Sequence, residues 1–126
     1  MTQLETATKY VAIVGSRTFS DRKAVEAYVK QLPNNVVVVS GGAKGVDTWA
    51  ALAAQKHGLK VKIFLPDWEQ YGRAAGFIRN QDIVDLAHEV VAFWDGKSRG
   101  TAHSMRLAKD KNKPLTVIKV ETPEDA

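Results

Sequence analysis

Five short apolar runs recur along the chain, at residues 10–14, 36–40, 60–65, 89–94 and 115–120. The second run begins with four consecutive valines, Val36 to Val39, whose branched side chains favour extended backbone. An apolar run without polar alternation is typical of a central strand that is covered on both faces. The third run, from Lys60 to Leu65, alternates at its start and therefore predicts a strand that is half-covered or lies at a sheet edge.

Helical patterns fill the intervals between these runs, at about residues 21–32, 46–57, 74–87 and 100–111. The first helix has Val25, Val29 and Leu32 on one face, and Ser20 or Asp21 can cap it. Strands that alternate with helices connect through right-handed crossovers. The sequence therefore predicts an α/β, doubly wound, mainly parallel sheet of about five strands, with helices on both faces.

The longest connection, residues 66–73, carries Trp68, Tyr71 and a glycine, and is expected to form a loop that serves as a lid or ligand wall. Residues 10–120 read as one domain, preceded by a flexible leader at 1–9 and followed by an acidic tail at 121–126. No segment is apolar enough for a membrane span, so we expect a cytoplasmic protein.

Composition excludes several kinds of site. The chain has no cysteine, which rules out disulfides and thiolate metal ligands. Its histidines, His57, His88 and His103, lack helical ligand spacing, so no metal site is expected. No Walker-type or nucleophile-elbow motif is present. The net charge of +4 only weakly favours polyanionic partners, because the basic residues are dispersed along the chain.

Small, hydroxylic and basic residues follow three of the predicted strands. Gly15, Ser16 and Arg17 follow the first strand, the glycine-rich segment 40–45 ends the second, and the segment 95–101 follows the fourth. Ligands of open α/β sheets bind outside the carboxyl ends of the strands, where these loops would meet. Free N–H groups at a helix start suit an anion, and phosphate is the commonest one. A purely structural turn is the alternative for each loop.

Several side chains in or near these loops have a structural role and a ligand-binding role as alternatives. Asp47 either binds N–H groups of its own helix or accepts hydrogen bonds from a ribose. Asn80 is on the inward face of its helix, bonded either to loop backbone or to a ligand, and Arg79 is expected to bind an anion. Trp68, Tyr71 and Trp94 could stack on a base, although packing is the commoner role of such rings.

Several motifs in a fixed order resemble one known family. They are Gly15-Ser16-Arg17-Thr18-Phe19, Gly41-Gly42-Ala43-Lys44-Gly45-Val46-Asp47, Trp68 with Tyr71-Gly72, Ala75-Gly76 with Arg79-Asn80, and Phe93-Trp94-Asp95-Gly96 with Ser98, Gly100 and Thr101. From about residue 10 to 120 the chain resembles the YspA/YpsA-related branch of the SLOG superfamily. That group includes the DNA-processing protein DprA (Smf) and the LOG phosphoribohydrolases. The resemblance implies a Rossmann-like domain that binds a nucleotide-type ligand.

The resemblance also shows departures that bear on activity. Residues Ser40 to Asp47 are similar to the Ser-Gly-x-Ala-x-Gly-Ile-Asp segment of DprA, although Ala51 stands where DprA-like sequences carry a histidine. LOG enzymes carry Pro-Gly-Gly-x-Gly-Thr-x-x-Glu, and here Ser104 replaces that glutamate. Hydrolysis by the LOG mechanism is therefore not expected. If an N-glycosidic bond is cleaved, Asp47 or Glu69 could substitute for the missing glutamate, and Asp47 is the candidate catalytic residue.

Three functions follow as hypotheses. The leading one is binding of a nucleotide-derived molecule such as AMP, ADP-ribose or an NAD-like compound, as a sensor or an enzyme, with no cofactor required. The alternatives are binding of single-stranded nucleic acid and N-glycosidic hydrolysis. A scaffold that binds no ligand and acts only through homo-oligomer contacts is the alternative without a binding site. The expected ligand-binding residues are Gly15, Ser16, Arg17, Gly41, Gly42, Ala43, Lys44, Gly45, Asp47, Trp68, Gly76, Arg79, Asn80, Trp94, Ser98, Gly100 and Thr101.

Overall fold

The computed structural model of the chain describes residues 7–119, in which five parallel strands form one sheet in the order β3-β2-β1-β4-β5. The strands are β1 (Lys9–Gly15), β2 (Val36–Ser40), β3 (Lys60–Ile63), β4 (Glu89–Trp94) and β5 (Leu115–Lys119). β2 is an interior strand, as its four valines predict, and β3 is at an edge. Most of the predicted leader, residues 1–6, and the predicted acidic tail lie outside the described residues.

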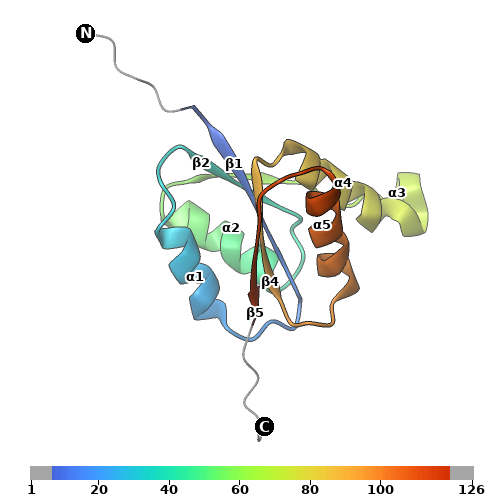
Figure 1. Ribbon diagram of the computed structural model, residues 1–126, viewed down its shortest axis with the longest axis horizontal. Helices are drawn as coiled ribbons and strands as arrows, with labels where there is room; N and C mark the ends of the chain where they lie inside the picture. The colour runs from blue at the N-terminus through green and yellow to red at the C-terminus, as the bar shows by residue number, and fades with distance from the viewer. Residues whose placement is uncertain (1–6, 120–126) are drawn as a thin grey trace, which may run out of the picture.

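Helices cover both faces of this sheet (Figure 1). α1 (Arg22–Lys30) and α2 (Val46–Lys56) pack on one face, and α4 (Ala75–Leu86) and α5 (Arg99–Asp110) on the other. The Rossmann-like, doubly wound architecture predicted from the alternating pattern is thereby confirmed. No helix among residues 7–119 combines the length and the apolar character that a membrane span requires.

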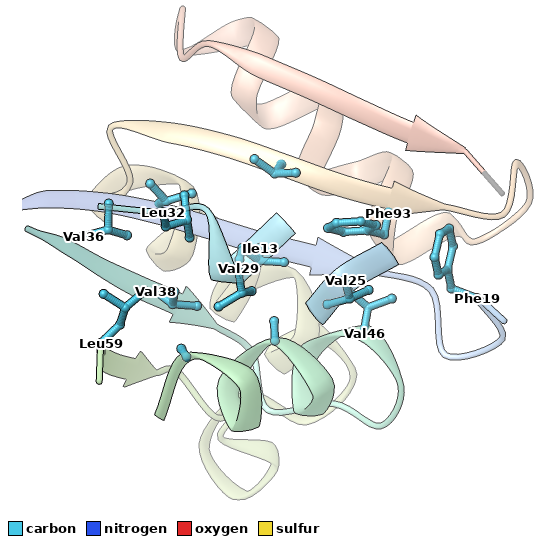
Figure 2. Close-up of a cluster of buried hydrophobic side chains, with 14 residues drawn as sticks. Ile13, Phe19, Val25, Val29, Leu32, Val36, Val38, Val46, Leu59 and Phe93 are labelled. Atoms are coloured by element: carbon cyan, nitrogen blue, oxygen red, sulfur yellow. The ribbon is translucent and has the colours of Figure 1, made fainter. Parts of the chain in front are cut away.

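The two-residue period of the strands divides the core into two layers. From β1, Val11 and Ile13 point toward α1 and α2, whereas Ala12 and Val14 point toward α4 and α5. Figure 2 shows the first layer, in which Phe93 of β4 lies edge-on to Phe19 at 5.5 Å between ring centroids. Because Phe19 is almost fully buried, this contact fixes the loop that leaves β1 against the end of β4.

The connection at residues 66–73 is not the irregular loop that was expected. It contains a short helix, α3 (Trp68–Tyr71), and a 3₁₀ turn, η1 (Gly72–Ala74). Asp67 caps α3 by accepting a hydrogen bond from the N–H of Gln70 at 3.1 Å. The prediction was wrong because aromatic residues and a glycine suggested a loop, while the capping role of Asp67 went unrecognised.

Two glycines allow α2 to begin directly beside the end of β1. A Cβ atom on Gly15 would lie 2.5 Å from the Cβ of Val46, the first residue of α2. Gly45 precedes that helix with a φ of +82°, and a Cβ there would lie 2.8 Å from the carbonyl oxygen of Arg17. The glycine-rich loop and the loop after β1 are therefore in contact.

Replacing Gly15 by alanine is expected to destabilise the protein. The added methyl group would overlap Val46, so α2 would have to move away from β1, and we expect the free energy of unfolding to fall by about 1–3 kcal/mol or more. Urea unfolding followed by circular dichroism measures this. Gly100→Ala is the matched control, because a Cβ there meets nothing within 4 Å and alanine favours a helix. Equal stability of the two variants would contradict the close contact.

Candidate functional site

A pocket of about 540 Å³ opens at the carboxyl ends of β1 and β4. These strands are neighbours, yet the chain leaves β1 toward β2 and leaves β4 toward β5, so their loops diverge and leave a crevice. Side chains and backbone from both sides of the sheet line it: Val14, Gly15, Arg17, Thr18, Ala43, Asp47, Arg79, Asn80, Ile83, Asp95, Lys97, Ser98, Gly100, Thr101 and Ser104. Loops that are distant along the chain thus converge, as the sequence predicted.

Asp47 occupies the first turn of α2 and is buried, with 6% of its surface exposed. Its Oδ2 accepts a hydrogen bond from the N–H of Ala43 at 3.2 Å, in the loop before its helix and not in the helix itself. Burial raises the pKa of Asp47 to about 6, although the N–H of Ala43 and the positive charge of Arg79 act in the opposite direction. The carboxyl group therefore titrates close to neutral pH.

Arg79 connects α4 to the glycine-rich loop. Its Nη1 donates to the carbonyl oxygen of Gly41 at 2.7 Å, and its Nε donates to Oδ1 of Asn80 at 3.0 Å. Nδ2 of Asn80 is 3.2 Å from Nδ1 of His103 on α5. Asn80 is thus satisfied by two neighbouring side chains, and not by loop backbone as its structural alternative assumed.

The glycine-rich loop does not present all of the amides that were expected to hold phosphate. The N–H of Gly42 donates to Oγ of Ser40 at 3.2 Å, and that of Ala43 is taken by Asp47. The amides expected to donate to phosphate are those of Gly41, Gly42, Ala43 and Gly45, so two of these four are already bonded. The side chains of Ser40 and Asp47 accept hydrogen bonds from these two N–H groups, which the residue pattern alone did not predict.

The loop after β4 is held by Asp95. Its Oδ1 accepts from the N–H groups of Lys97 and Ser98, each at 2.8 Å, and its Oδ2 accepts from the Thr18 hydroxyl at 2.7 Å. These donors hold the pKa of Asp95 far below its usual range. Ser98 in turn caps α5, with its Oγ accepting from the N–H of Thr101. Asp95 therefore fixes the start of α5 and leaves Lys97 and Thr101 at the pocket.

The predicted site residues separate into two groups. Nine of them line the pocket: Gly15, Arg17, Ala43, Asp47, Arg79, Asn80, Ser98, Gly100 and Thr101. Others lie outside its lining: Ser16, Gly41, Gly42, Lys44, Gly45, Trp68, Gly76 and Trp94. Of these, Ser16 is buried and accepts from the N–H of Asp95, and Trp94 donates its ring N–H to the carbonyl of Ser98. Both side chains therefore hold residues of the pocket wall, Asp95 and Ser98, in place without lining the pocket themselves.

Thr18, Asp95 and Lys97 line the pocket but were not among the predicted residues. Asp95-Gly96 is a recognisable turn signal, because an aspartate binds backbone N–H groups two or three residues ahead. That signal could have identified Asp95 and Lys97. Nothing in the sequence linked Thr18 to Asp95, since they are distant along the chain and meet only through the pairing of β1 with β4.

The pocket brings together three cations and two carboxylates. Burial lowers the pKa of Arg79, Asp47 counteracts this, and the positive charge of Arg17 lowers it further. The carboxylates of Asp47 and Asp95 already accept hydrogen bonds from the protein. The guanidinium groups and Lys97 are thus the parts of this surface suited to an added anion. Among residues 7–119 no cluster of histidine and carboxylate side chains could hold a metal ion.

Asp47→Asn is expected to change how stability depends on pH. A carboxyl in the unfolded chain titrates near pH ~3.9, so between about pH 4 and 6 the folded state binds more protons and the free energy of unfolding falls as pH rises. The variant should therefore be more stable than the wild type by about 1–3 kcal/mol at neutral pH and above, and nearly equal to it near pH ~4. Urea titrations across this range test this prediction.

Asp95→Asn is the control with the opposite sign. Its folded pKa is depressed, so the carboxylate stabilises the fold above the unfolded pKa, and that contribution disappears as pH falls through the folded pKa. This variant should be less stable than the wild type at neutral pH. If Asp47→Asn also loses stability there, the cost assigned to the buried Asp47 carboxylate is wrong.

Comparison with known proteins agrees with this architecture. Residues 9–71 match the YspA, cpYpsA-related SLOG family. The Gene 61 protein of Mycobacterium phage D29 is 38% identical, over 83% of this chain and 92% of the phage protein. DNA processing protein DprA of Streptococcus pneumoniae (strain ATCC BAA-255 / R6) is 50% identical over 52 residues, which are 40% of this chain and 18% of DprA.

Two solved structures of DprA share the fold. That of S. pneumoniae DprA has a TM-score of 0.81 and 25% identity, over 93% of this chain and 52% of its own. That of Helicobacter pylori DprA, described for its single-stranded DNA binding mode, has a TM-score of 0.77 and 25% identity, over 94% of this chain and 68% of its own. This chain thus spans about half of the S. pneumoniae DprA structure. From its sequence match and its shared fold, the chain belongs to the YspA, cpYpsA-related SLOG family.

Proposed function

We propose that the pocket binds the phosphate backbone of single-stranded DNA. The observation that carries this proposal is the meeting of two guanidinium groups, Arg17 and Arg79, close enough for the charge of one to lower the pKa of the other. Like charges at one site repel each other, and an anion between them removes that cost. A phosphate group fits best, because its oxygens accept paired hydrogen bonds from guanidinium.

Further features of the pocket suit a phosphate. Lys97 adds a third cation. The hydroxyl groups of Ser98 and Thr101 are bonded to each other at 3.1 Å, which leaves one hydroxyl hydrogen as a donor at the start of α5. The likeness to H. pylori DprA, which binds single-stranded DNA, supports a strand as the ligand. These features favour the nucleic-acid hypothesis over the free nucleotide that the sequence placed first.

Arg17→Ala is expected to weaken binding of an oligothymidine of about 12 nucleotides by roughly tenfold. Arg17 has no carboxylate partner among residues 7–119, so its loss removes a phosphate contact without breaking an ion pair of the fold. Fluorescence anisotropy between about 50 and 200 mM salt measures this, and the slope of log affinity against log salt should decrease in magnitude by about 0.7.

Lys109→Ala is the matched control. Lys109 is an exposed cation in the last turn of α5, at the end of that helix opposite the pocket, so its removal should leave affinity and salt slope nearly unchanged. Absence of oligonucleotide binding at low salt would overturn the proposal. So would an equal loss of affinity in both variants, because it would indicate attraction to net charge and not to this pocket.

A free nucleotide-derived molecule, such as AMP, ADP-ribose or an NAD-like compound, is the second candidate ligand. The pocket volume of about 540 Å³ favours it, since small-molecule sites commonly have volumes of this size. Asp47 at the wall would accept a hydrogen bond from a ribose hydroxyl, as a carboxylate does in dinucleotide sites.

Thermal denaturation with each nucleotide tests this second candidate. A ligand that binds only the folded state raises the melting temperature, and the shift grows with the logarithm of its concentration above Kd. If the second candidate is correct, one of these compounds should stabilise the wild type, and Asp47→Asn should reduce that shift. A compound that displaces the oligothymidine at micromolar concentration would make the nucleotide the primary ligand, and no shift with any of them would remove this candidate.

A further inference from the structure

An exposed apolar ridge lies between β3 and the first turn of α4. It consists of Leu65, Trp68, Tyr71 and Phe77, whose exposed fractions are 71%, 59%, 42% and 55%. Three of the four are aromatic, and α3, which carries two of them, projects from the side of the molecule next to α4 (Figure 1). Several large, solvent-exposed aromatic side chains on one short segment indicate a binding surface.

The ridge borders the pocket on the α4 side. The ring of Phe77 lies edge-on to His103, with 4.7 Å between ring centroids and 84° between ring planes. His103 is in turn 3.2 Å from the side chain of Asn80, which lines the pocket. The exposed ring of Phe77 is therefore linked to the pocket wall through a single residue, His103.

The ridge also borders the pocket through the glycine-rich loop. A Cβ on Gly42 would lie 2.8 Å from Cδ2 of Leu65, so Leu65 covers this loop immediately beside Ala43 of the pocket wall. A Cβ on Gly76 would lie 3.9 Å from Cη2 of Trp68, which places Trp68 over the start of α4. The apolar ridge therefore adjoins the pocket wall at Leu65 and, through His103, at Phe77.

We propose that this ridge stacks the bases of the strand whose phosphate the pocket holds, an inference that rests on the proposed function. A single strand offers alternating charged phosphates and flat apolar bases, and the surface offers cations beside flat apolar rings. Stacking on aromatic side chains is tolerant of sequence, because every base has a π face. The ridge therefore predicts a preference for strands that carry bases, with little preference among them.

A second copy of this chain is the other occupant that an apolar ridge could accept. A stable contact between proteins buries about 800 Å² on each partner and does not require an adjoining cationic pocket. The position of the ridge beside the pocket is thus the reason for assigning it to bases.

Two oligonucleotides of equal length and charge test the proposal, one of thymidine and one in which every nucleotide lacks its base. The wild type should bind the thymidine strand more tightly. Trp68→Ala and Phe77→Ala should each weaken binding of the thymidine strand by about tenfold and leave binding of the abasic strand unchanged. Trp68→Phe, which keeps a ring, should retain most of the affinity.

Leu52→Ala is the control, because Leu52 is 49% exposed on α2 and is not part of the ridge or the pocket lining. It should bind both strands like the wild type. If Trp68→Ala and Phe77→Ala affect both strands equally or neither, the stacking proposal fails, while the proposed function stands provided that Arg17→Ala weakens both. If neither strand binds, both proposals fail. A change of sedimentation mass in Trp68→Ala without a base-dependent loss would identify the ridge as a contact between copies and overturn the assignment.

Discussion

The contact between Gly15 and Val46 is the constraint on which the pocket depends. β1 is the middle strand of the sheet, and the first residue of α2 lies where a side chain on Gly15 would be. This contact places the first turn of α2, and with it Asp47, beside the end of β1. The pairing of β1 with β4 then brings the loop that starts at Asp95 to the same place. A larger residue at position 15 would separate these walls.

The charges of the pocket divide between holding the protein together and facing a ligand. Asp47 and Asp95 accept hydrogen bonds from backbone N–H groups, so both carboxylates organise loops. Arg79 has both roles, because it donates a hydrogen bond to the carbonyl oxygen of Gly41 and also lines the pocket. Arg17 and Lys97 have no carboxylate partner among residues 7–119. The carboxylates of the pocket are therefore already hydrogen-bonded within the protein. An anion that enters the pocket would contact the cations of Arg17 and Lys97.

The relation to DprA gives this arrangement a context. The chain has the fold of the DprA structures over more than nine-tenths of its own length, but the S. pneumoniae structure is about twice as long. The Gene 61 protein of phage D29, in contrast, is covered almost completely. The fold of this chain thus corresponds to part of DprA and to nearly the whole of the phage protein.

The sequence determined the fold and the location of the pocket. Apolar runs that alternate with helical patterns defined five parallel strands, and the glycine, serine and arginine residues at their ends marked the loops that converge. The boundaries of most elements agree within one or two residues, because turn and capping residues such as Asp21 and Gly58 act locally. The short helix α3 was missed, since a one-turn helix has no periodic pattern to recognise.

Which groups at the pocket are free depends on contacts between segments that are distant along the chain. The bond between Asp47 and the N–H of Ala43, the bridge from Arg79 to Gly41 and the contact of Thr18 with Asp95 depend on side-chain directions that no spacing encodes. They removed expected amide donors and added Thr18, Asp95 and Lys97 to the lining. Burial likewise set the pKa of Asp47, because desolvation depends on what the fold places around a carboxyl group and not on its neighbours in sequence.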